Sequence, residues 1–337
     1  MSFSSYRVFL EFLTEIAPRS VAIVTHVNPD PDAVASAVLV KELLLTMSGV
    51  QTVTLIFPEG PSALSKRVLD EFAPSTTYIK EGEPDVDAII VVDTPSSAQL
   101  ASFSGFVRSK LGRVLVIDHH RESGDLLAQA RSVIWKPEAA CVLLVLEVAR
   151  AAGVKLQTGL ASLCVAGILY DTARFLRATP SALRAVAELI EQGASYGDAV
   201  RVLQERPSLS ERVAKLKAAS RAIILRVGDV ILAGSYVASH EAAAARALLS
   251  LGADVAVVAG GKRGEVRISL RASRSFFDRT GISLGKDIVP LLSDVLEGEG
   301  GGHDLAAGFN GRGDPQRALS TTLRIIYSEL RSRIFSR

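Results

Sequence analysis

Three stretches of the sequence are apolar without interruption, and each leads directly into ionisable side chains. Residues 21–24 lead to His26, residues 88–92 to Asp93, and residues 114–117 to Asp118. Apolar runs that do not alternate with polar residues are typical of parallel strands covered on both faces. The carboxyl ends of parallel strands meet at one edge of the sheet, where open α/β sheets bind their ligands. The sequence therefore predicts an α/β fold with an N-terminal parallel sheet and a site at the strand ends.

The segment after the first apolar run carries an imidazole and two carboxylates. Asp30 and Asp32 follow His26 closely, and two intervening prolines exclude regular strand pairing. The pattern beyond Asp32 predicts an amphipathic helix with Lys41 and Glu42 on its outer face. Crowded carboxylates beside an imidazole favour a bound divalent cation. The alternative is an ordinary turn with an aspartate at the helix N-cap, which needs no metal.

The later strand ends repeat this chemistry. His119 and His120 follow Asp118 directly, and because side chains alternate along an extended backbone we expect the two rings to diverge. One imidazole would then bind metal and the other would face substrate. Asp171 interrupts the apolar face of a helix predicted from Thr158, where a carboxylate is costly unless it is paired or coordinated. The alternatives are a helix cap or turn role for Asp93 and an exposed helix end for Asp171.

Composition limits the partners and the compartment. The chain has 337 residues, 48% of them hydrophobic, which suffices for two domains. Its formal net charge of +2 gives no bulk electrostatic reason to bind long nucleic acid or a membrane. Cys141 and Cys164 both lie in apolar runs, as buried thiols do in a reducing compartment. Residues 4–16 predict an amphipathic helix rather than a signal peptide, and no segment is apolar for long enough to span a bilayer. We expect a cytoplasmic protein.

The second half of the chain has a different pattern. Residues 180–219 are helical and increasingly charged, without a buried strand, so we expect a first domain over 1–207 and a linker over 208–220. The remainder, 221–337, mixes strands and helices and predicts a smaller mixed-sheet α/β domain. We predict strands over 222–227, 230–236, 255–259 and 265–273, with a helix over 241–251.

The predicted strand 265–273 carries a local concentration of positive charge. Its alternation places Arg267, Ser269 and Arg271 on one face, with Lys262, Arg263 and Arg274 nearby. Arginine suits phosphate because its planar fork forms bidentate hydrogen bonds. The alternative is an ordinary solvated strand face. Further on, three glycines (Gly300, Gly301 and Gly302) precede His303 and predict a loop whose backbone approaches a ligand closely.

Taken together, these motifs resemble those of the DHH phosphoesterase superfamily, in the branch with a DHH-associated C-terminal domain. The resemblance rests on His-x-Asn-Pro-Asp-x-Asp-Ala from His26, the strand-end Asp93, Asp-His-His from Asp118, Asp-Thr from Asp171 and Gly-Gly-Gly-His-x-x-Ala-Ala-Gly from Gly300. It covers nearly the whole chain and is most similar to the nanoRNase and pAp-phosphatase group, with a further likeness to archaeal RecJ-type proteins. Ala35 and Ala173 depart from the family pattern, which often has glycine at these positions.

The resemblance implies two Mn²⁺ ions, with Mg²⁺ or Co²⁺ as substitutes. It implies that Asp93 bridges them and that His120 faces the scissile phosphate, with Asp118 orienting it. In the second domain it implies that Arg271, the glycine run and His303 hold the substrate end, and the strand face adds Ser269. The ligands implied for the first ion are His26, Asp30 and Asp93, and for the second Asp32, Asp93, His119 and Asp171.

The expected function is manganese-dependent hydrolysis of short RNA or DNA oligonucleotides, with pAp as a further substrate. Two cations can share and activate a water molecule for in-line attack at phosphorus, so no protein nucleophile is needed. The alternatives are a cyclic di-AMP or pApA phosphodiesterase, a RecJ-type single-strand exonuclease, and a non-enzymatic module beside replication proteins. The expected partners are short oligonucleotides or nucleotides and no membrane, and a homodimer remains open.

Overall fold

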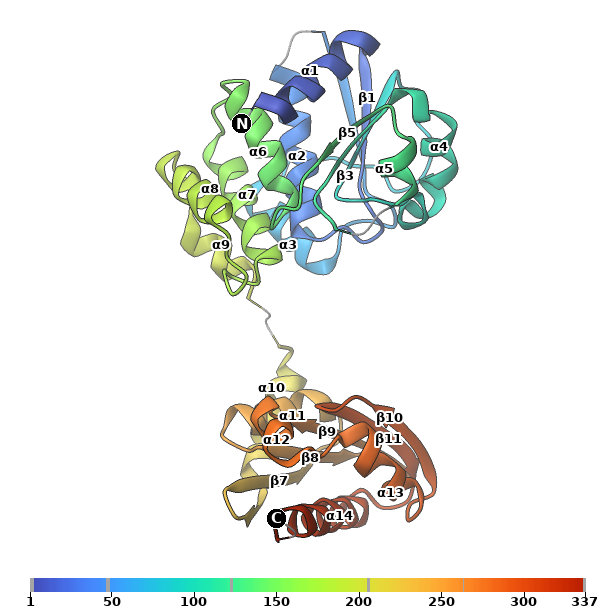
Figure 1. Cartoon of the computed structure of the whole chain (residues 1–337), viewed down its shortest axis with the longest axis vertical. Coiled ribbons are helices and arrows are strands. Elements are labelled where there is room, and N and C mark those ends of the chain that lie inside the picture. The colour runs from blue at the N-terminus through green and yellow to red at the C-terminus, as the bar shows by residue number, and fades with distance from the viewer. Residues whose placement is uncertain (1–2, 47–48, 122–123, 205–206, 263, 336–337) are drawn as a thin grey trace. The chain divides into compact units, whose positions relative to one another are not determined.

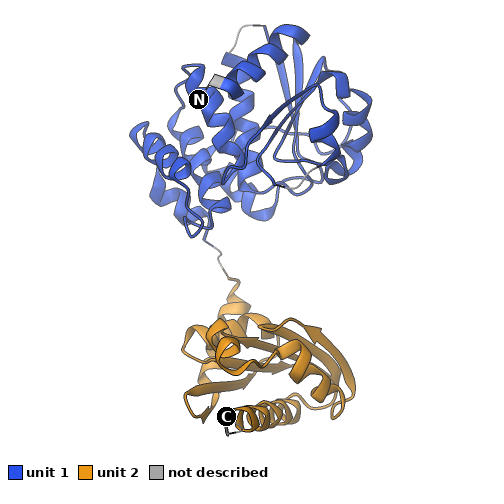
Figure 2. Ribbon diagram, viewed as in Figure 1, with its two compact units in different colours: residues 1–204 blue, residues 205–337 orange. Residues whose placement is uncertain are grey.

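The computed structural model describes residues 3–46, 49–121, 124–204, 207–262 and 264–335. The chain forms two compact units, Met1–Gln204 and Glu205–Arg337 (Figure 2). Residues 208–220, predicted as a helical linker, form the helix α10 (Leu209–Ser220), which packs along α11 (Glu241–Ser250) of the second unit. Its small residues Ala214 and Ala218 are buried in that contact, so the segment is part of the second core.

The first unit is built on a five-stranded, entirely parallel sheet (Figure 1). The order is β2-β1-β3-β4-β5, so the three apolar runs of the sequence lie side by side in the centre. Every residue of β3 and β4 is buried, as expected of strands covered on both faces. The strands are β1 (Ser20–Val24), β2 (Thr52–Ile56), β3 (Ala88–Val92), β4 (Val114–Asp118) and β5 (Ser132–Trp135), of which β5 was not predicted.

Helices cover both faces of this sheet. Alternate strand residues such as Ile23 and Ile90 enter the larger core, and their neighbours Ala22 and Ile89 enter the core on the opposite face. The fold class predicted from the sequence is therefore confirmed. The larger core includes α1 (Phe3–Ile16), α2 (Pro31–Thr46), α3 (Ala63–Phe72), α6 (Cys141–Ala151), α7 (Thr158–Asp171), α8 (Pro180–Glu191) and α9 (Tyr196–Val202). The smaller includes η1 (Ser97–Phe103), α4 (Ser104–Ser109) and α5 (Asp125–Gln129), and η2 (Leu111–Arg113) precedes β4.

Helix α2 differs from its prediction as an amphipathic surface helix. Its residues are buried around almost its whole circumference, and Lys41 and Glu42 are themselves half-buried. The cause is its position, because α2 packs against both α6 and α7 as well as the strands. One close approach is at Gly167 of α7, where an added Cβ would lie 3.0 Å from the Cβ of Ala35. This small-residue contact brings the start of α2 close to α7.

The second unit contains a six-stranded mixed sheet in the order β10-β11-β9-β8-β7-β6. All neighbouring strands are antiparallel except β7 and β8. α10 and α11 contribute to the core on one face of the sheet, and α14 to the core on the other. The strands are β6 (Ile223–Val227), β7 (Val230–Tyr236), β8 (Val255–Gly260), β9 (Glu265–Ala272), β10 (Gly298–Gly302) and β11 (Ala306–Arg312). The remaining helices are α12 (Arg274–Thr280), η3 (Leu284–Ile288), α13 (Val289–Ser293) and α14 (Pro315–Phe335).

The glycine run is an edge strand rather than the predicted loop. Gly300 and Gly301 pair with Phe309 and Gly308 of β11 in an antiparallel hairpin. Glycine is required at Gly302, whose φ is 153°, because an added Cβ would lie 2.4 Å from the carbonyl oxygen of Ala306. The sequence pattern that suggested a flexible phosphate loop thus serves to form a close-packed hairpin.

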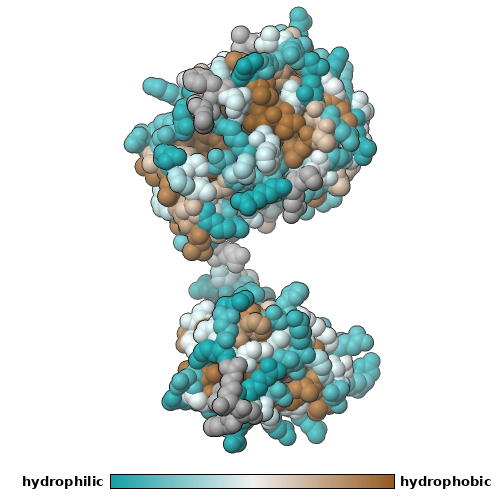
Figure 3. Space-filling model, viewed as in Figure 1, coloured by the Kyte–Doolittle hydropathy of each residue, from teal (hydrophilic) through white to brown (hydrophobic). Residues whose placement is uncertain are grey.

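The visible surface of both units is mainly hydrophilic, with separate hydrophobic patches (Figure 3). Several large apolar side chains are exposed, among them Leu209 and Leu216 on α10 and Trp135 at the end of β5. Over the residues that the structure describes, every helix is too short or too polar to cross a lipid bilayer.

Candidate active site

Asp93 is the centre of the candidate site. It follows β3 directly, is buried, and adopts a left-handed backbone with φ of 57°. This conformation is uncommon for a residue other than glycine, although aspartate tolerates it better than most. Its backbone N–H donates to the carbonyl of Ile117 on β4 over 2.9 Å. The chain therefore turns at the strand end in a way that fixes the position of the Asp93 carboxylate.

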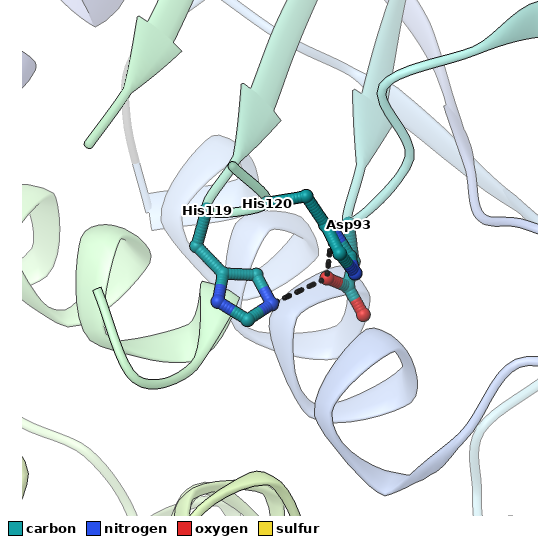
Figure 4. A group of neighbouring side chains, drawn as sticks. All are labelled: Asp93, His119 and His120. Atoms are coloured by element: carbon teal, nitrogen blue, oxygen red, sulfur yellow. Dashed lines mark ion pairs between the residues drawn. The ribbon is translucent and has the colours of Figure 1, made fainter. Parts of the chain in front are cut away.

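The rings of His119 and His120 both approach this carboxylate (Figure 4). Nε2 of His119 lies 3.2 Å from Oδ1 of Asp93, and Nδ1 of His120 lies 3.7 Å from the same oxygen. The ring centroids are 4.5 Å apart, so the predicted divergence of the two side chains was wrong. That prediction assumed an extended backbone, but β4 ends at Asp118 and both histidines follow the strand.

The carboxylate of Asp118 accepts two hydrogen bonds from His120. Nδ1–H of His120 donates to Oδ1 of Asp118 over 2.8 Å, and the backbone N–H of His120 donates to Oδ2 over 3.2 Å. This hydrogen bond raises the pKa of His120 despite partial burial, and Asp93 contributes to the shift. His120 is thus held by its Nδ1 edge, and Nε2 is the nitrogen left for other contacts.

The first predicted ligand group is assembled from the segment after β1. His26, Asp30 and Asp93 offer ligand atoms that lie within 4.8 Å of one another. Nδ1–H of His26 donates to the carbonyl of Val27 over 2.8 Å, which leaves Nε2 as the accepting nitrogen of the neutral ring. Oδ1 of Asp30 accepts from the backbone N–H groups of Asp32 and Ala33. Asp30 therefore caps α2, and its carboxylate also belongs to the ligand group.

The second predicted ligand group combines Asp32, His119 and Asp171, again within 4.8 Å of one another. Nε2 of His119 lies 3.3 Å from Oδ2 of Asp171 and 3.9 Å from Oδ2 of Asp32. Nδ1–H of His119 donates to the carbonyl of Glu138 over 3.0 Å. Asp171 is the last residue of α7, and the close α2–α7 contact at Gly167 brings it near Asp32.

The backbone after Asp171 shows why the family pattern often has glycine at the position of Ala173. Ala173 has φ of 49°, and the next two residues are also in the left-handed region. Glycine adopts this conformation without steric cost, which is a physical reason to find it often at this position. Here alanine occupies it and the helix still ends at Asp171.

The charges of the site are unbalanced. Burial raises the pKa of Asp171 to about 7, with further contributions from Asp30 and Asp93. Burial and Asp93 likewise raise the pKa of Asp30, and raise that of Asp32 well above its usual range. Burial lowers the pKa of His119, but its contacts with Asp93 and Asp32 outweigh this and raise it to about 10. Carboxylates that resist ionisation around an imidazole that retains its proton indicate a site lacking positive charge.

These residues fit a divalent metal centre. Oδ1 of Asp93 and Nε2 of His119 are buried and make no hydrogen bond among the described residues, which is rare for buried polar atoms. His26 and His119 both donate Nδ1–H to backbone carbonyls, the arrangement that orients metal-binding imidazoles. Carboxylate oxygen with imidazole nitrogen is a donor set for borderline divalent cations. All six predicted ligands lie in these two groups. The first group includes Asp93, and the second contacts Asp93 through His119.

In the second unit, three of the predicted substrate residues line one groove of about 390 Å³. They are Ser269, Arg271 and Gly301, with Ala306 to Gly308 completing one wall. Arg271 is half-buried and donates to the carbonyl of Leu270 over 2.8 Å. Burial lowers its pKa, with a smaller contribution from Arg246. The groove therefore places one partly desolvated cation beside the glycine strand.

Other members of the predicted positive patch are neutralised or lie elsewhere. Arg267 lines the same groove but forms an ion pair with Glu241 over 2.9 Å, and Arg274 pairs with Asp278. Arg263 lies outside the described residues. Gly300, Gly302 and His303 are not among the residues that line the groove. His303 is exposed, and its backbone N–H closes the hairpin on the carbonyl of Ala306.

Sequence reasoning missed the residues that hold the ligands in place. Asp32 accepts hydrogen bonds from the backbone N–H groups of Cys141 and Val142, at the start of α6. The carbonyl of Glu138 holds His119. These are backbone contacts between segments roughly 20 or more than 100 residues apart in the chain. The preceding Pro137 and the uncapped start of α6 are the only sequence features near them, and neither identifies a partner.

Several known proteins are similar to this chain. Residues 20–168 match the model of the DHH family, N-terminal domain. An uncharacterized protein of Methanocaldococcus jannaschii is 29% identical over 321 residues, which cover 94% of each chain. The crystal structure of an exopolyphosphatase-related protein from Bacteroides fragilis is 18% identical and covers 98% of this chain and 96% of that one, with a TM-score of 0.58. RecJ of Thermus thermophilus in complex with Mn²⁺ covers 98% of this chain and 55% of that one, at 13% identity and a TM-score of 0.36.

The match includes β1, β3 and β4 and five of the six predicted ligands, from His26 to His119. The sixth, Asp171, lies just beyond it and is in contact with His119. Enzymes of this family are hydrolases that depend on divalent metal ions and act on phosphate ester bonds. Residues 20–168 are thus similar to the DHH family, N-terminal domain, and the site has the acidic and imidazole groups that a metal-dependent hydrolase requires.

Proposed function

We propose that this protein hydrolyses very short oligonucleotides with manganese as its metal, and that it also acts on nucleotides such as pAp. The observation that carries the proposal is the convergence of five candidate ligands on a sixth, Asp93, beside a histidine that is held by a carboxylate. The preference for short substrates is supported by the near-neutral charge of the chain, because binding a long strand rests on many phosphate contacts.

On this proposal the two ligand groups would hold divalent cations, and Asp93 is close enough to contribute to both groups. His26 and Asp30 complete one group, and Asp32, His119 and Asp171 complete the other. The bound ions would supply an activated water molecule and stabilise charge on the phosphoryl oxygens. Asp32 is kept in place by the N–H groups of α6, so the ligand set is oriented before any ion binds.

His120 would act on the phosphate itself. Asp118 fixes the ring through Nδ1 and favours its protonated form, so Nε2–H can donate to a phosphate oxygen or to the leaving group. Asp118 is fully buried and thus acts as a positioning residue for His120. Both residues come from the same strand end, which keeps their relative geometry rigid.

The groove of the second unit is a separate candidate site for a phosphate group. Arg271 can form charge-assisted hydrogen bonds with a terminal phosphate, and the exposed backbone at Gly301 lets a ligand approach closely. Dinucleotides and similar small esters should be preferred, because the near-neutral chain has little positive charge for the many phosphate contacts of a long strand.

A side-by-side hydrolysis assay with Mn²⁺ tests this proposal. The substrates are a dinucleotide, a long single strand, pAp and cyclic di-AMP, with Asp93→Asn as the control for a contaminating activity. We expect the dinucleotide to be hydrolysed fastest and pAp to be accepted. Faster release of mononucleotides from the long strand would favour a RecJ-type exonuclease, and preferential cleavage of cyclic di-AMP would favour a cyclic dinucleotide phosphodiesterase. Either result would overturn the proposed substrate class.

A further inference from the structure

The chain contains one tryptophan, Trp135, and it lies at the edge of the candidate site. It is the last residue of β5, the edge strand of the parallel sheet. In the β4–β5 register it is paired with Asp118, the residue that holds His120. Neighbouring strands lie about 4.8 Å apart, so the backbone of Trp135 runs directly beside that of the catalytic segment.

The side chain of Trp135 is on the same side of the sheet as Asp118. Ile134 enters the larger core and Val133 packs against the smaller one, so the alternation of the strand turns Trp135 away from the larger core. Nε1–H of its indole donates to the carbonyl of His120 over 2.6 Å. The ring is therefore tied by its polar edge to the histidine that faces substrate.

The ring itself remains accessible. Trp135 is 44% exposed, whereas Phe9, Phe57 and other large aromatic residues of this chain are fully buried. Burial of an indole is strongly favourable, so an exposed one that is held in a fixed orientation is an unusual arrangement. Three residues further on, Glu138 holds His119 through its carbonyl. The segment 135–138 thus borders both imidazoles of the site.

We propose that Trp135 is the stacking platform for the nucleobase of the nucleotide next to the scissile phosphate. The proposal rests on the proposed function, and it adds a reason for the enzyme to prefer nucleotide esters over phosphate esters without a base. Aromatic side chains stack on every nucleobase because each base has a flat π-face, which suits an enzyme for short substrates of varied sequence. Its hydrogen bond to His120 keeps the indole from rotating away when the base leaves.

Kinetics with a base-free analogue test the proposal. The substrates are a dinucleotide and the same dinucleotide with an abasic residue beside the scissile phosphate. We expect Trp135→Ala to raise KM for the dinucleotide by about 5–150-fold, the range that stacking on one base contributes, and to leave KM for the abasic analogue unchanged. Trp135→Phe keeps an aromatic ring for stacking, so its KM for the dinucleotide should stay close to that of the wild type. Tyr196→Ala, which removes a similarly exposed aromatic side chain (39%) from α9, should behave as wild type.

Fluorescence gives a second measurement that does not depend on turnover. Since Trp135 is the sole tryptophan, its emission reports on this site alone. With Mg²⁺ present, 5′-AMP should quench the emission of the wild-type protein, and ribose 5-phosphate should not. Equal responses to the two ligands, or a loss of activity in Trp135→Ala that is the same for both substrates, would overturn the proposal and indicate a purely structural role. Quenching by 5′-AMP in a protein that hydrolyses none of the substrates would instead support stacking and refute the proposed function.

Discussion

The two units handle charge in opposite ways. In the first, four buried or half-buried carboxylates and His119 are held together at strand and helix ends, and the site has too little positive charge of its own. In the second, the groove beside β9 is open, and Arg267 is already neutralised by Glu241. Carboxylates that are crowded together without enough positive charge favour binding of a cation. The open groove around Arg271 can instead accept different substrate ends. The proposed function thereby assigns chemistry to the first unit and substrate choice to the second.

The largest expected effect is the loss of activity in Asp93→Ala. Asp93 contacts both ligand groups, so its removal should lower kcat/KM by at least about 10³-fold, equivalent to roughly 4 kcal/mol of transition-state stabilisation. Bound metal measured by atomic absorption should fall together with activity. Full metal content and full activity in Asp93→Ala would contradict the assignment of Asp93 as the centre of the site. The contrast between the charge-poor site of the first unit and the open groove of the second would then be lost.

Asp118→Asn should have a smaller effect and leave the metal content intact. The substitution preserves shape but removes the charge that holds His120 in its protonated form, and loss of such a partner costs about 10–100-fold in activity. The pH–rate profile should shift to lower pH, since the pKa of His120 is raised mainly by Asp118. An unchanged profile would show that His120 does not titrate in the reaction.

In the second unit, Arg271→Ala should raise KM rather than lower kcat. A hydrogen bond to a charged group contributes about 1.5–3 kcal/mol, so an increase of roughly 10–100-fold is expected for a substrate with a terminal phosphate. Arg267→Ala is the matched control on the same strand, and because its guanidinium is engaged by Glu241 it should have little effect. Equal effects of the two variants would indicate a general positive field instead of a specific contact.

The smallest expected effect is on stability, and it depends on pH. Asp171 changes its pKa from 3.8 to about 7 on folding, so the folded protein binds more protons and loses stability as pH rises through this window. His119, raised from 6.5 to about 10, contributes stability that is lost as pH rises between these values. The Tm of the metal-free protein should therefore decline with rising pH, by about 2–4 °C per kcal/mol for a unit of this size.

Addition of Mn²⁺ should reverse that decline, and its stabilising effect should grow with pH as the carboxylates release their protons. The measurement is thermal unfolding from pH 5 to pH 9 with and without the metal. A metal-free protein that is more stable at pH 9 than at pH 5 would contradict the view that the first site is short of positive charge.

The first site could be predicted from the sequence more completely than the second. His26, Asp93 and Asp118 follow apolar runs that have no polar interruption, and parallel strands necessarily bring such ends to one edge. The convergence of His119 and His120 could not be predicted, because it depends on where β4 ends. The amides that hold Asp32 lie on a helix that is distant in sequence, and no local pattern identifies such a contact.

The second unit was harder to predict because its features have more than one physical meaning. The glycine run fits both a phosphate loop and an edge strand, and the choice was decided by pairing with β11, which the sequence pattern did not predict. Segment 208–220 has the composition of a connector, yet its small residues pack on α11. The position of Trp135 at a strand end could not be predicted, because β5 has only four residues and its pattern is too short to recognise.

The close contact between Ala35 and Gly167 has a consequence for redesign. These two small residues set how near the start of α2 comes to α7, and so they set the separation of Asp32 from Asp171. Replacing Gly167 with alanine would push the helices apart by a few tenths of an ångström while leaving all ligands in the chain. The preference among Mg²⁺, Mn²⁺ and larger ions would then change through the distance between Asp32 and Asp171. The ligand residues would stay the same, because Gly167 is not one of them.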